Sequence, residues 1–330
     1  MQIVVHGGAG SDPENPTERQ EVLEGAADAG AAEAEVVDAV QTAVGVLESS
    51  PRFNAGVGSA VQSDGKIRTD AGIMTDNRSV GAVCSMEGVK RATRVARIVM
   101  EETPHTFVSG DHAVELAESF DVEVDADLWT DRTREKWDDL EVPVGGARTQ
   151  LEWIDERFGE TDAGGRDGAD IDRETEAPSN EYESDVHHPG EDGDRYGDQR
   201  ACGDEHDHDT VGAVAFDGDS LAAATSTGGR WLALAGRVGD VPQVGSGFYC
   251  SPAAAVSATG AGEDIARTTL SRRVAGHVER GLEAGAAAEL AIEEFAELTG
   301  STAGVIVVDA RGHLGSAYNS NAMQTATERQ

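Results

Sequence analysis

The chain is poor in lysine and in positive charge generally. It has three lysines among 26 basic residues, against 62 acidic residues, and its formal net charge is −36. Such a surface repels polyanions, so we expect no nucleic-acid partner. Residues 160–209 carry −14 of this charge and −22 remains elsewhere, so one acidic loop does not account for it. Because self-repulsion is screened at about 1 M salt, where the Debye length is ~3 Å, the composition predicts a halophilic protein, adapted to a salt-rich cytoplasm.

Cysteine and long apolar runs are also scarce. The three cysteines, Cys84, Cys202 and Cys250, are an odd number without metal-ligand spacing, and indicate neither a disulfide framework nor a zinc site. No apolar run reaches the ~18 residues of a membrane helix, and the first residues lack the basic and apolar segments of a secretion signal. We therefore expect a cytoplasmic protein with no membrane partner, whose 38% hydrophobic content suffices for a large core.

The apolar pattern predicts a mixture of helices and antiparallel strands. Asp64-Gly65 and the turn at Asp217-Gly218 separate strand-like runs, which predicts hairpins and hence antiparallel sheets. We expect strands at 2–5, 59–62, 67–74, 80–84, 211–216, 221–227, 254–258, 303–309 and from 317. Helical spacing predicts helices at 16–48, 89–102, 110–120, 127–158, 263–281 and 284–298. The favoured architecture is α+β, one domain with two sheets between helix layers, a four-layer αββα sandwich.

The sharpest change in composition falls at Thr210. The preceding residues, 159–209, are acidic and glycine-rich, typical of a mobile linker, whereas a β-branched strand pattern begins after Thr210. Cleavage of the Asp209–Thr210 bond would give Thr210 a hydroxyl and a free α-amine, which is a nucleophile with its own base. His206 and His208 raise the alternative of a metal, but two histidines in an acidic tail are more often solvated.

Hydroxyls, glycines and an Arg/Asp pair follow Thr210 closely. Thr225, Ser226 and Thr227 end a strand predicted to pair with the one that Thr210 begins, so a hydroxyl from this run can lie beside that of Thr210. Arg237 offers a fork for a carboxylate and Asp240 an acceptor for an ammonium, so the two suit the zwitterionic end of an α-amino acid; the alternative is an intraloop salt bridge. The turn at Thr259-Gly260 offers a hydroxyl and an open N–H to an oxyanion, or simply caps the next helix.

Eight motifs, in order, resemble the plant-type asparaginase and isoaspartyl peptidase family of N-terminal-nucleophile hydrolases. They are His6-Gly-Gly-Ala-Gly10, predicted to form a tight turn, Phe53–Gly58, Asp70–Met74, Ala96–His105, Asp209–Val214, Thr225–Gly229, Gly236–Asp240 and Ser257–Gly260. They span nearly the whole chain except 120–208. The resemblance implies the αββα fold, self-cleavage between Asp209 and Thr210, and a heterotetramer of two α subunits (1–209) and two β subunits (210–330).

The same resemblance implies a role for each matching residue. Thr210 is expected to be the nucleophile, and Thr227 to orient it. Arg237 and Asp240 are expected to bind the α-carboxylate and α-amine of the substrate, and Thr259 and Gly260 to hold the oxyanion. No cofactor is expected in the chemistry. A structural sodium ion is implied, bound by the backbone carbonyls of Leu47, Glu48, Ser50, Phe53, Ala55 and Val57.

The implied activity is hydrolysis of L-asparagine and of β-aspartyl dipeptides. Two departures from the family pattern lie near the expected site: Arg230–Ala235 replaces a polar, asparagine-containing loop, and Gly260-Ala-Gly262 replaces glycine-threonine-glycine. The His208-Asp-Thr210 spelling leaves glycosylasparaginase as an alternative enzyme. The alternative from another class is an uncleaved module that binds aspartate-like ligands through Arg237 and Asp240.

The charge balance leads to a first prediction. The protein should have a lower free energy of unfolding in dilute buffer than in about 1 M potassium chloride, because salt screens the repulsion among its acidic groups. Thermal melting curves at the two salt concentrations measure the difference. Equal stability in both would contradict adaptation to high salt.

Overall fold

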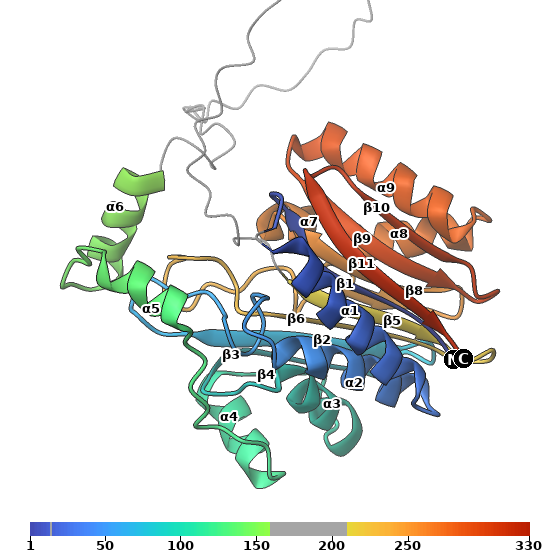
Figure 1. Cartoon of the computed structure of the whole chain (residues 1–330), viewed down its shortest axis with the longest axis horizontal. Coiled ribbons are helices and arrows are strands. Elements are labelled where there is room, and N and C mark those ends of the chain that lie inside the picture. Colours follow the sequence, from blue (N-terminus) through green and yellow to red (C-terminus); the bar gives the residue numbers. More distant parts are fainter. Residues whose placement is uncertain (14, 159–209) are drawn as a thin grey trace, which may run out of the picture.

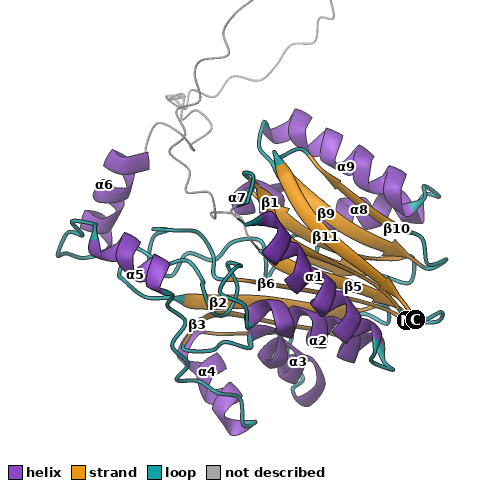
Figure 2. Ribbon diagram, in the orientation of Figure 1, coloured by secondary structure: helices purple, strands orange, loops and turns teal. Residues whose placement is uncertain are grey.

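The computed structural model of the protein describes residues 1–13, 15–158 and 210–330. Two β-sheets lie face to face, and helices cover the outer side of each (Figure 1). Figure 2 shows the strands enclosed between helices on both sides. The predicted α+β class and the four-layer αββα sandwich are therefore confirmed. No described helix is long and apolar enough to cross a membrane.

The strands form one sheet of seven and one of four in the described residues, with the orders β11-β1-β5-β6-β2-β3-β4 and β10-β9-β8-β7. Neighbours run antiparallel, as the hairpin turns predict, except for the parallel pair β3 and β4. The strands are β1 Gln2–Gly10, β2 Arg68–Thr75, β3 Val80–Glu87, β4 Phe107–Ser109, β5 Val211–Phe216, β6 Leu221–Thr227, β7 Phe248–Cys250, β8 Ala254–Gly260, β9 Ala303–Asp309, β10 Leu314–Tyr318 and β11 Ala322–Arg329.

The helices divide between the two outer layers. Helices α1 to α4 contact the seven-stranded sheet, while α8 and α9 contact the four-stranded sheet. Figure 1 shows α5 and α6 to one side of this stack. Their bounds are α1 Pro16–Ala31, α2 Val36–Glu48, α3 Ala92–Glu102, α4 Gly110–Ser119, α5 Asp131–Asp138, α6 Ala147–Phe158, α7 Gly262–Thr268, α8 Leu270–Glu279 and α9 Ala284–Thr299.

Strand β1 is buried on both of its faces. Ile3 and Val5 belong to the core beneath the helices, and Val4 belongs to the core between the sheets. Side chains alternate along a strand, so consecutive apolar residues serve two different cores. This is why the central strands read as continuous apolar runs rather than as alternating ones.

Three predicted helices are each broken in two. The 127–158 pattern forms α5 and α6, with residues 139–146 between them. The 16–48 pattern folds back after Ala31, so that α1 and α2 pack on each other. A Cβ atom on Gly30 would lie 2.8 Å from the Ala39 carbonyl oxygen, so glycine permits this close approach. The 263–281 pattern breaks at Thr269, which has a left-handed φ of 49°. In the 16–48 and 263–281 patterns the helical period continues across a change of direction that periodicity cannot reveal.

Three strand predictions need correction. His6–Gly10 is not a separate turn: β1 runs to Gly10 with an irregularity between His6 and Ala9. The predicted hairpin of 59–75 is reduced to one bridge, between Val61 and Ile67, because β2 pairs with β3 and β6 instead. The expected final edge strand is two strands, β10 in one sheet and β11 in the other.

The contact between the sheets gives a second prediction. A Cβ atom on Gly72 of β2 would lie 2.0 Å from Cε1 of the fully buried Phe248 on β7. Gly72→Ala should therefore lower the free energy of unfolding by about 1–3 kcal/mol through overpacking. Gly285→Ala in α9 is the matched control, since nothing lies within 4 Å of its Cβ position, and it should be neutral or stabilising by up to about 1 kcal/mol. Denaturant titration compares the two, and equal effects would refute the packing argument.

Candidate active site

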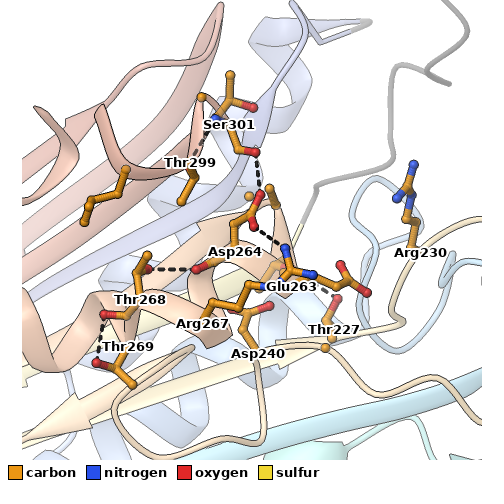
Figure 3. A pocket seen from close by; sticks show the side chains of 18 of the residues that line it. Thr227, Arg230, Asp240, Glu263, Asp264, Arg267, Thr268, Thr269, Thr299 and Ser301 are labelled. Atoms are coloured by element: carbon orange, nitrogen blue, oxygen red, sulfur yellow. Dashed lines mark hydrogen bonds and ion pairs between the residues drawn. The ribbon is translucent and has the colours of Figure 1, made fainter. Parts of the chain in front are cut away.

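A cavity of about 1050 Å³ opens at the end of the space between the sheets. Its lining comes from Thr210 just before β5, the end of β6 and the segment that follows it, the β8–α7 turn, helices α7 and α8, and the segment from the end of α9 to β9. Figure 3 shows these side chains converging from several elements. Segments distant in the sequence therefore meet at one place.

Thr210 faces this space because of its position on the strand. The next residues alternate: Val211 and Ala213 face the helix-side core, while Val214 and Phe216 face the second sheet. Thr210 falls on the second set. Pairing of β5 with β6 places Thr227 beside it, and the Thr210 hydroxyl donates a hydrogen bond to Thr227 Oγ1 at 3.1 Å.

The two threonines are nearly enclosed. Thr210 is 8% exposed and Thr227 4% exposed. Thr227 Oγ1 also accepts a hydrogen bond from the Gly229 backbone N–H at 3.1 Å, which fixes the acceptor of the Thr210 proton. The arrangement presents one hydroxyl to the cavity, held by a second that is itself held by the backbone.

Arg237 and Asp240 both line the cavity, but among the described residues they are not joined by the ion pair that the sequence left open. Arg237 donates from Nε and Nη2 to both oxygens of Glu263, at 2.8 and 2.7 Å. Its Nη1 makes no hydrogen bond to the described residues and lies against Gly239, where a Cβ atom would be 2.9 Å away. One side of the guanidinium is thus open for a second carboxylate.

The Asp240 carboxyl group has a buried oxygen that could accept a hydrogen bond from a cation. It is 5% exposed, and its Oδ2 has no hydrogen-bond partner in the part of the chain that the structure describes. Burial raises the pKa of its carboxyl to about 7, against the lowering effect of Arg237. A buried acceptor without a donor is costly unless a ligand supplies one, so an ammonium group would suit this position.

The predicted oxyanion residues lie together at the end of β8. Gly260 lines the cavity with a φ of 135°, and its Cβ position would meet the Thr302 carbonyl oxygen at 2.5 Å, so only glycine fits there. Thr259 is fully buried, and its Oγ1 accepts from the Ala9 N–H at 3.4 Å. Thr259 lies outside the cavity lining, whereas Thr210, Thr227, Arg237, Asp240 and Gly260 all belong to it.

A polar chain beneath the site joins the two sheets. His6 Nε2 lies 2.8 Å from Ser257 Oγ, which lies 2.6 Å from Thr225 Oγ1, and all three side chains are fully buried. Burial lowers the pKa of His6 to about 3, so the imidazole is neutral at physiological pH. Hydrogen bonds between neutral groups hold β1, β6 and β8 in register behind the nucleophile.

Sequence reasoning missed two acidic residues of the site. Glu263 is the first residue of the helix predicted over 263–281; it directly follows the Gly260-Ala-Gly262 turn and binds Arg237. Asp70 pairs with Thr227 across β2 and β6, so Thr210, Thr227 and Asp70 form one row facing the second sheet. Asp70 Oδ1 accepts from the Ser85 N–H at 2.8 Å. The Asp70–Met74 motif is the feature of the sequence that could have indicated Asp70. Only the order of the strands, however, shows that Asp70 lies beside Thr227.

The segment Leu47–Gly58, predicted to bind sodium, curls back on itself. Gly56 and Gly58 have left-handed φ angles of 59° and 92°. A Cβ atom on Gly56 would lie 2.1 Å from the Glu48 carbonyl oxygen, and one on Gly58 3.0 Å from that of Phe53. The loop therefore closes around carbonyl oxygens, the ligands that hard cations take. These residues fit such an ion, and its binding stays a prediction.

Several predictions fall outside the described residues. These are Asp209 of the cleavage site, the linker 159–209, and His206, His208 and Cys202. Within the described residues, Cys84 and Cys250 are free and buried, and no cluster of three or more His, Cys, Asp or Glu could hold a metal.

The fold and the site together define a class. Two facing sheets between helix layers, with a buried threonine at the start of a central strand, are the architecture of the N-terminal-nucleophile hydrolases. The hydroxyl pair and the charged cavity suit a nucleophilic hydrolase acting on a small zwitterion.

The chain belongs to the asparaginase family, whose model matches residues 1–330. It is 36% identical to the plant-type L-asparaginase of Pyrococcus abyssi, over 99% of this chain and 95% of that protein. It is 38% identical to the plant-type L-asparaginase of Pyrobaculum calidifontis, over 97% and 94%. It is 34% identical to the isoaspartyl peptidase/L-asparaginase of Danio rerio, over 99% and 92%. The predicted family is thus confirmed.

The buried carboxyl of Asp70 gives a third prediction. Burial raises its pKa from 3.8 to about 7, despite opposing effects of the Ser85 N–H and Arg237. In the unfolded chain Asp70 ionises near pH 4, whereas in the folded protein it stays protonated up to about pH 7, so the free energy of unfolding falls as the pH rises over this range. Asp70→Asn removes this loss because asparagine does not titrate. The melting temperature of Asp70→Asn minus that of the unmodified protein should therefore increase from pH 5 to pH 8. A difference independent of pH would show that Asp70 does not titrate in this way.

Proposed function

We propose that this enzyme hydrolyses L-asparagine to L-aspartate and ammonia, and also cleaves β-aspartyl dipeptides. The observation that carries the proposal is the Thr210–Thr227 hydrogen bond inside a cavity that also presents Arg237 and Asp240. Relatives named as plant-type L-asparaginases and as isoaspartyl peptidase/L-asparaginases support both substrates.

The first step in this proposal is processing of the chain. The Thr210 hydroxyl attacks the Asp209 carbonyl carbon, the acyl group moves from nitrogen to oxygen, and water hydrolyses the resulting ester. The products are a chain of residues 1–209, ending in a carboxylate, and one of 210–330, beginning with an amine. That amine has a pKa of about 8 and stands next to its own hydroxyl.

Substrate hydrolysis then uses the same hydroxyl. The α-amine takes the Thr210 proton as Oγ1 attacks the side-chain amide carbon of asparagine or the isopeptide carbon of a dipeptide. Thr227 orients the hydroxyl, and Thr259 and Gly260 stabilise the oxyanion. The leaving amine takes a proton and departs, and water attacks the acyl-threonine to release aspartate.

Arg237 and Asp240 hold the aspartyl end. The α-carboxylate binds the open side of the Arg237 guanidinium, opposite Glu263, and the α-ammonium binds Asp240 Oδ2. The reaction needs no cofactor in this scheme. A sodium ion on the carbonyls of the Leu47–Val57 loop would hold that loop in shape. We also propose the assembly of two α and two β subunits, in a salt-rich cytoplasm.

A fourth prediction tests the nucleophile. Thr210→Ala removes the attacking hydroxyl, so the protein should stay one full-length chain on a denaturing gel and release no ammonia from asparagine. Thr327→Ala, which removes an exposed hydroxyl on β11, is the control and should behave as the unmodified enzyme, with two bands and full activity.

The other outcomes separate the alternatives. A processed and active Thr210→Ala protein would refute the assignment of the nucleophile. Turnover of glycoasparagine without turnover of asparagine would select a glycosylasparaginase. An unmodified protein that stays uncleaved and binds aspartate without hydrolysis would be a binding module.

A further inference from the structure

The uncut chain lacks the base that the proposed mechanism uses after cleavage. Until the bond before it is cut, the Thr210 nitrogen belongs to an amide, which does not take up a proton at neutral pH. The first attack by the Thr210 hydroxyl therefore needs another proton acceptor. Among the described residues this hydroxyl has one partner, Thr227 Oγ1, at 3.1 Å. Because a threonine hydroxyl cannot hold a second proton at neutral pH, the proton must pass further.

The Thr227 hydroxyl has one hydrogen-bonding position left open. A hydroxyl can accept two hydrogen bonds and donate one. Thr227 Oγ1 accepts one bond from the Thr210 hydroxyl and one from the Gly229 N–H, so both of its lone pairs are occupied. Its hydrogen has no acceptor in the part of the chain that the structure describes. Thr227 is also buried, so bulk water has little access to this hydrogen.

Asp70, which pairs with Thr227 across β2 and β6, has the complementary opening. Its Oδ1 accepts a hydrogen bond from the Ser85 N–H at 2.8 Å, whereas its Oδ2 accepts none from the described residues. Asp70 is buried as well. A buried donor without an acceptor and a buried acceptor without a donor are each unfavourable. A hydrogen bond from Thr227 to Asp70 would satisfy both groups.

The two side chains lie on the same face of adjacent strands. Gly72, two residues beyond Asp70, lies against Phe248 of the second sheet, so Asp70 faces that sheet as Thr227 does. The Cβ atoms of directly paired residues are about 4.5–5.5 Å apart, which a carboxylate and a hydroxyl can bridge by rotation of their side chains. No hydrogen bond joins the two in the described uncut chain, and such catalytic contacts are often long before the reacting groups close.

A β-bulge holds Asp70 from its other side. The register of β2 and β3 shifts between Thr69 and Ala71, so that Asp70 stands opposite two residues, Cys84 and Ser85. Ser85 has a left-handed φ of 57°, which is uncommon for a residue with a side chain. Bulges recur beside active sites, where they direct a side chain. Here the bulged residue supplies the N–H that binds one carboxyl oxygen and leaves the other available.

The Asp70 carboxyl can exchange a proton near neutral pH. Burial raises its pKa to about 7, against the lowering effects of the Ser85 N–H and of Arg237. The other titratable groups that respond to its charge are Cys84 and Asp240. Burial mainly, and the charge of Asp70 in part, raises the pKa of both. A base is most effective when its pKa lies near the working pH.

We propose that Asp70 is the base for self-cleavage, acting through Thr227. As Thr210 Oγ1 bonds to the carbonyl carbon of the preceding residue, its proton passes to Thr227 Oγ1 and the Thr227 hydrogen passes to Asp70 Oδ2. When the carbon–nitrogen bond breaks, Asp70 returns a proton through Thr227 to the Thr210 nitrogen. An ester and an amine result, and Asp70 is again ionised. This inference rests on the proposed self-cleavage and names the base of its first step.

The test separates cleavage of the chain from turnover of substrate. Asp70→Asn keeps an oxygen for the Ser85 N–H but cannot take up a proton. Its rate of cleavage, followed on denaturing gels, should be about 100- to 10,000-fold lower, which is the usual contribution of a general base. The kcat for asparagine, expressed per cleaved chain, should stay within about threefold of the unmodified enzyme, because the Thr210 amine then serves as the base.

Two further variants complete the comparison. In a Thr227→Val background, Asp70→Asn should cause no additional loss of cleavage rate, because the route to Asp70 is already broken. Asp309→Asn changes another buried aspartate, which binds backbone N–H groups between β9 and β10. It should cleave at the unmodified rate. Additive losses in the double variant, or equal loss of cleavage and turnover in Asp70→Asn, would overturn the inference.

A measurement on the unmodified chain needs no variant to fold. Uncut protein made below pH 5 and moved to higher pH should be cleaved at a rate that rises about tenfold per pH unit and levels off above about pH 7, as Asp70 ionises. A cleavage rate independent of pH between 5 and 8 would overturn the inference. A chain that is never cleaved, or that is cleaved and inactive on every substrate, would instead refute the proposed function.

Discussion

The hydrogen bond between Thr210 and Thr227 requires two strands to be fixed in register beneath a second sheet. That register is maintained by the polar chain of His6, Ser257 and Thr225, which is fully buried and crosses from one sheet to the other. Apolar packing alone would permit small slips of one sheet over the other, whereas hydrogen bonds between buried groups have a direction and tolerate little displacement. The position of the nucleophile thus depends on bonds it does not itself make.

Charge around Arg237 is the second constraint. One guanidinium stands among three carboxyl groups, those of Asp70, Asp240 and Glu263, and burial alone would raise the pKa of each. Glu263 binds Arg237 directly and ionises readily, while the other two have pKa values near 7. The pocket is therefore close to neutral before a substrate arrives, although the surface of the protein is strongly acidic. A zwitterion can enter without a large change in local charge.

Much of the site could be predicted because its chemistry is local in the sequence. Thr210 stands at an abrupt change in composition, and Thr227 ends a strand joined to it by a short hairpin, so their contact follows from pairing rules. Asp70 was not assigned to the site because β2 reaches β6 across more than 140 residues, and no short-range pattern records strand order. The break after Ala31 was not predicted for a related reason. The apolar spacing of α1 continues in α2 although the chain reverses its direction between the two helices. Propensity specifies elements, whereas tertiary packing specifies which of them are neighbours.

The order of strands in the larger sheet has a topological consequence. In the order β11-β1-β5-β6-β2, strands β11, β5 and β6 come from residues after 210, whereas β1 and β2 come from residues before it. Strands from the two parts of the chain are therefore mixed in one sheet. The two termini also meet, since the Met1 amine donates to the Gln330 carbonyl at 2.7 Å. A cut at Thr210 would therefore leave two polypeptides interleaved in one sheet, inseparable without breaking three strand interfaces. The two pieces would be as interdependent as the halves of an uncut domain.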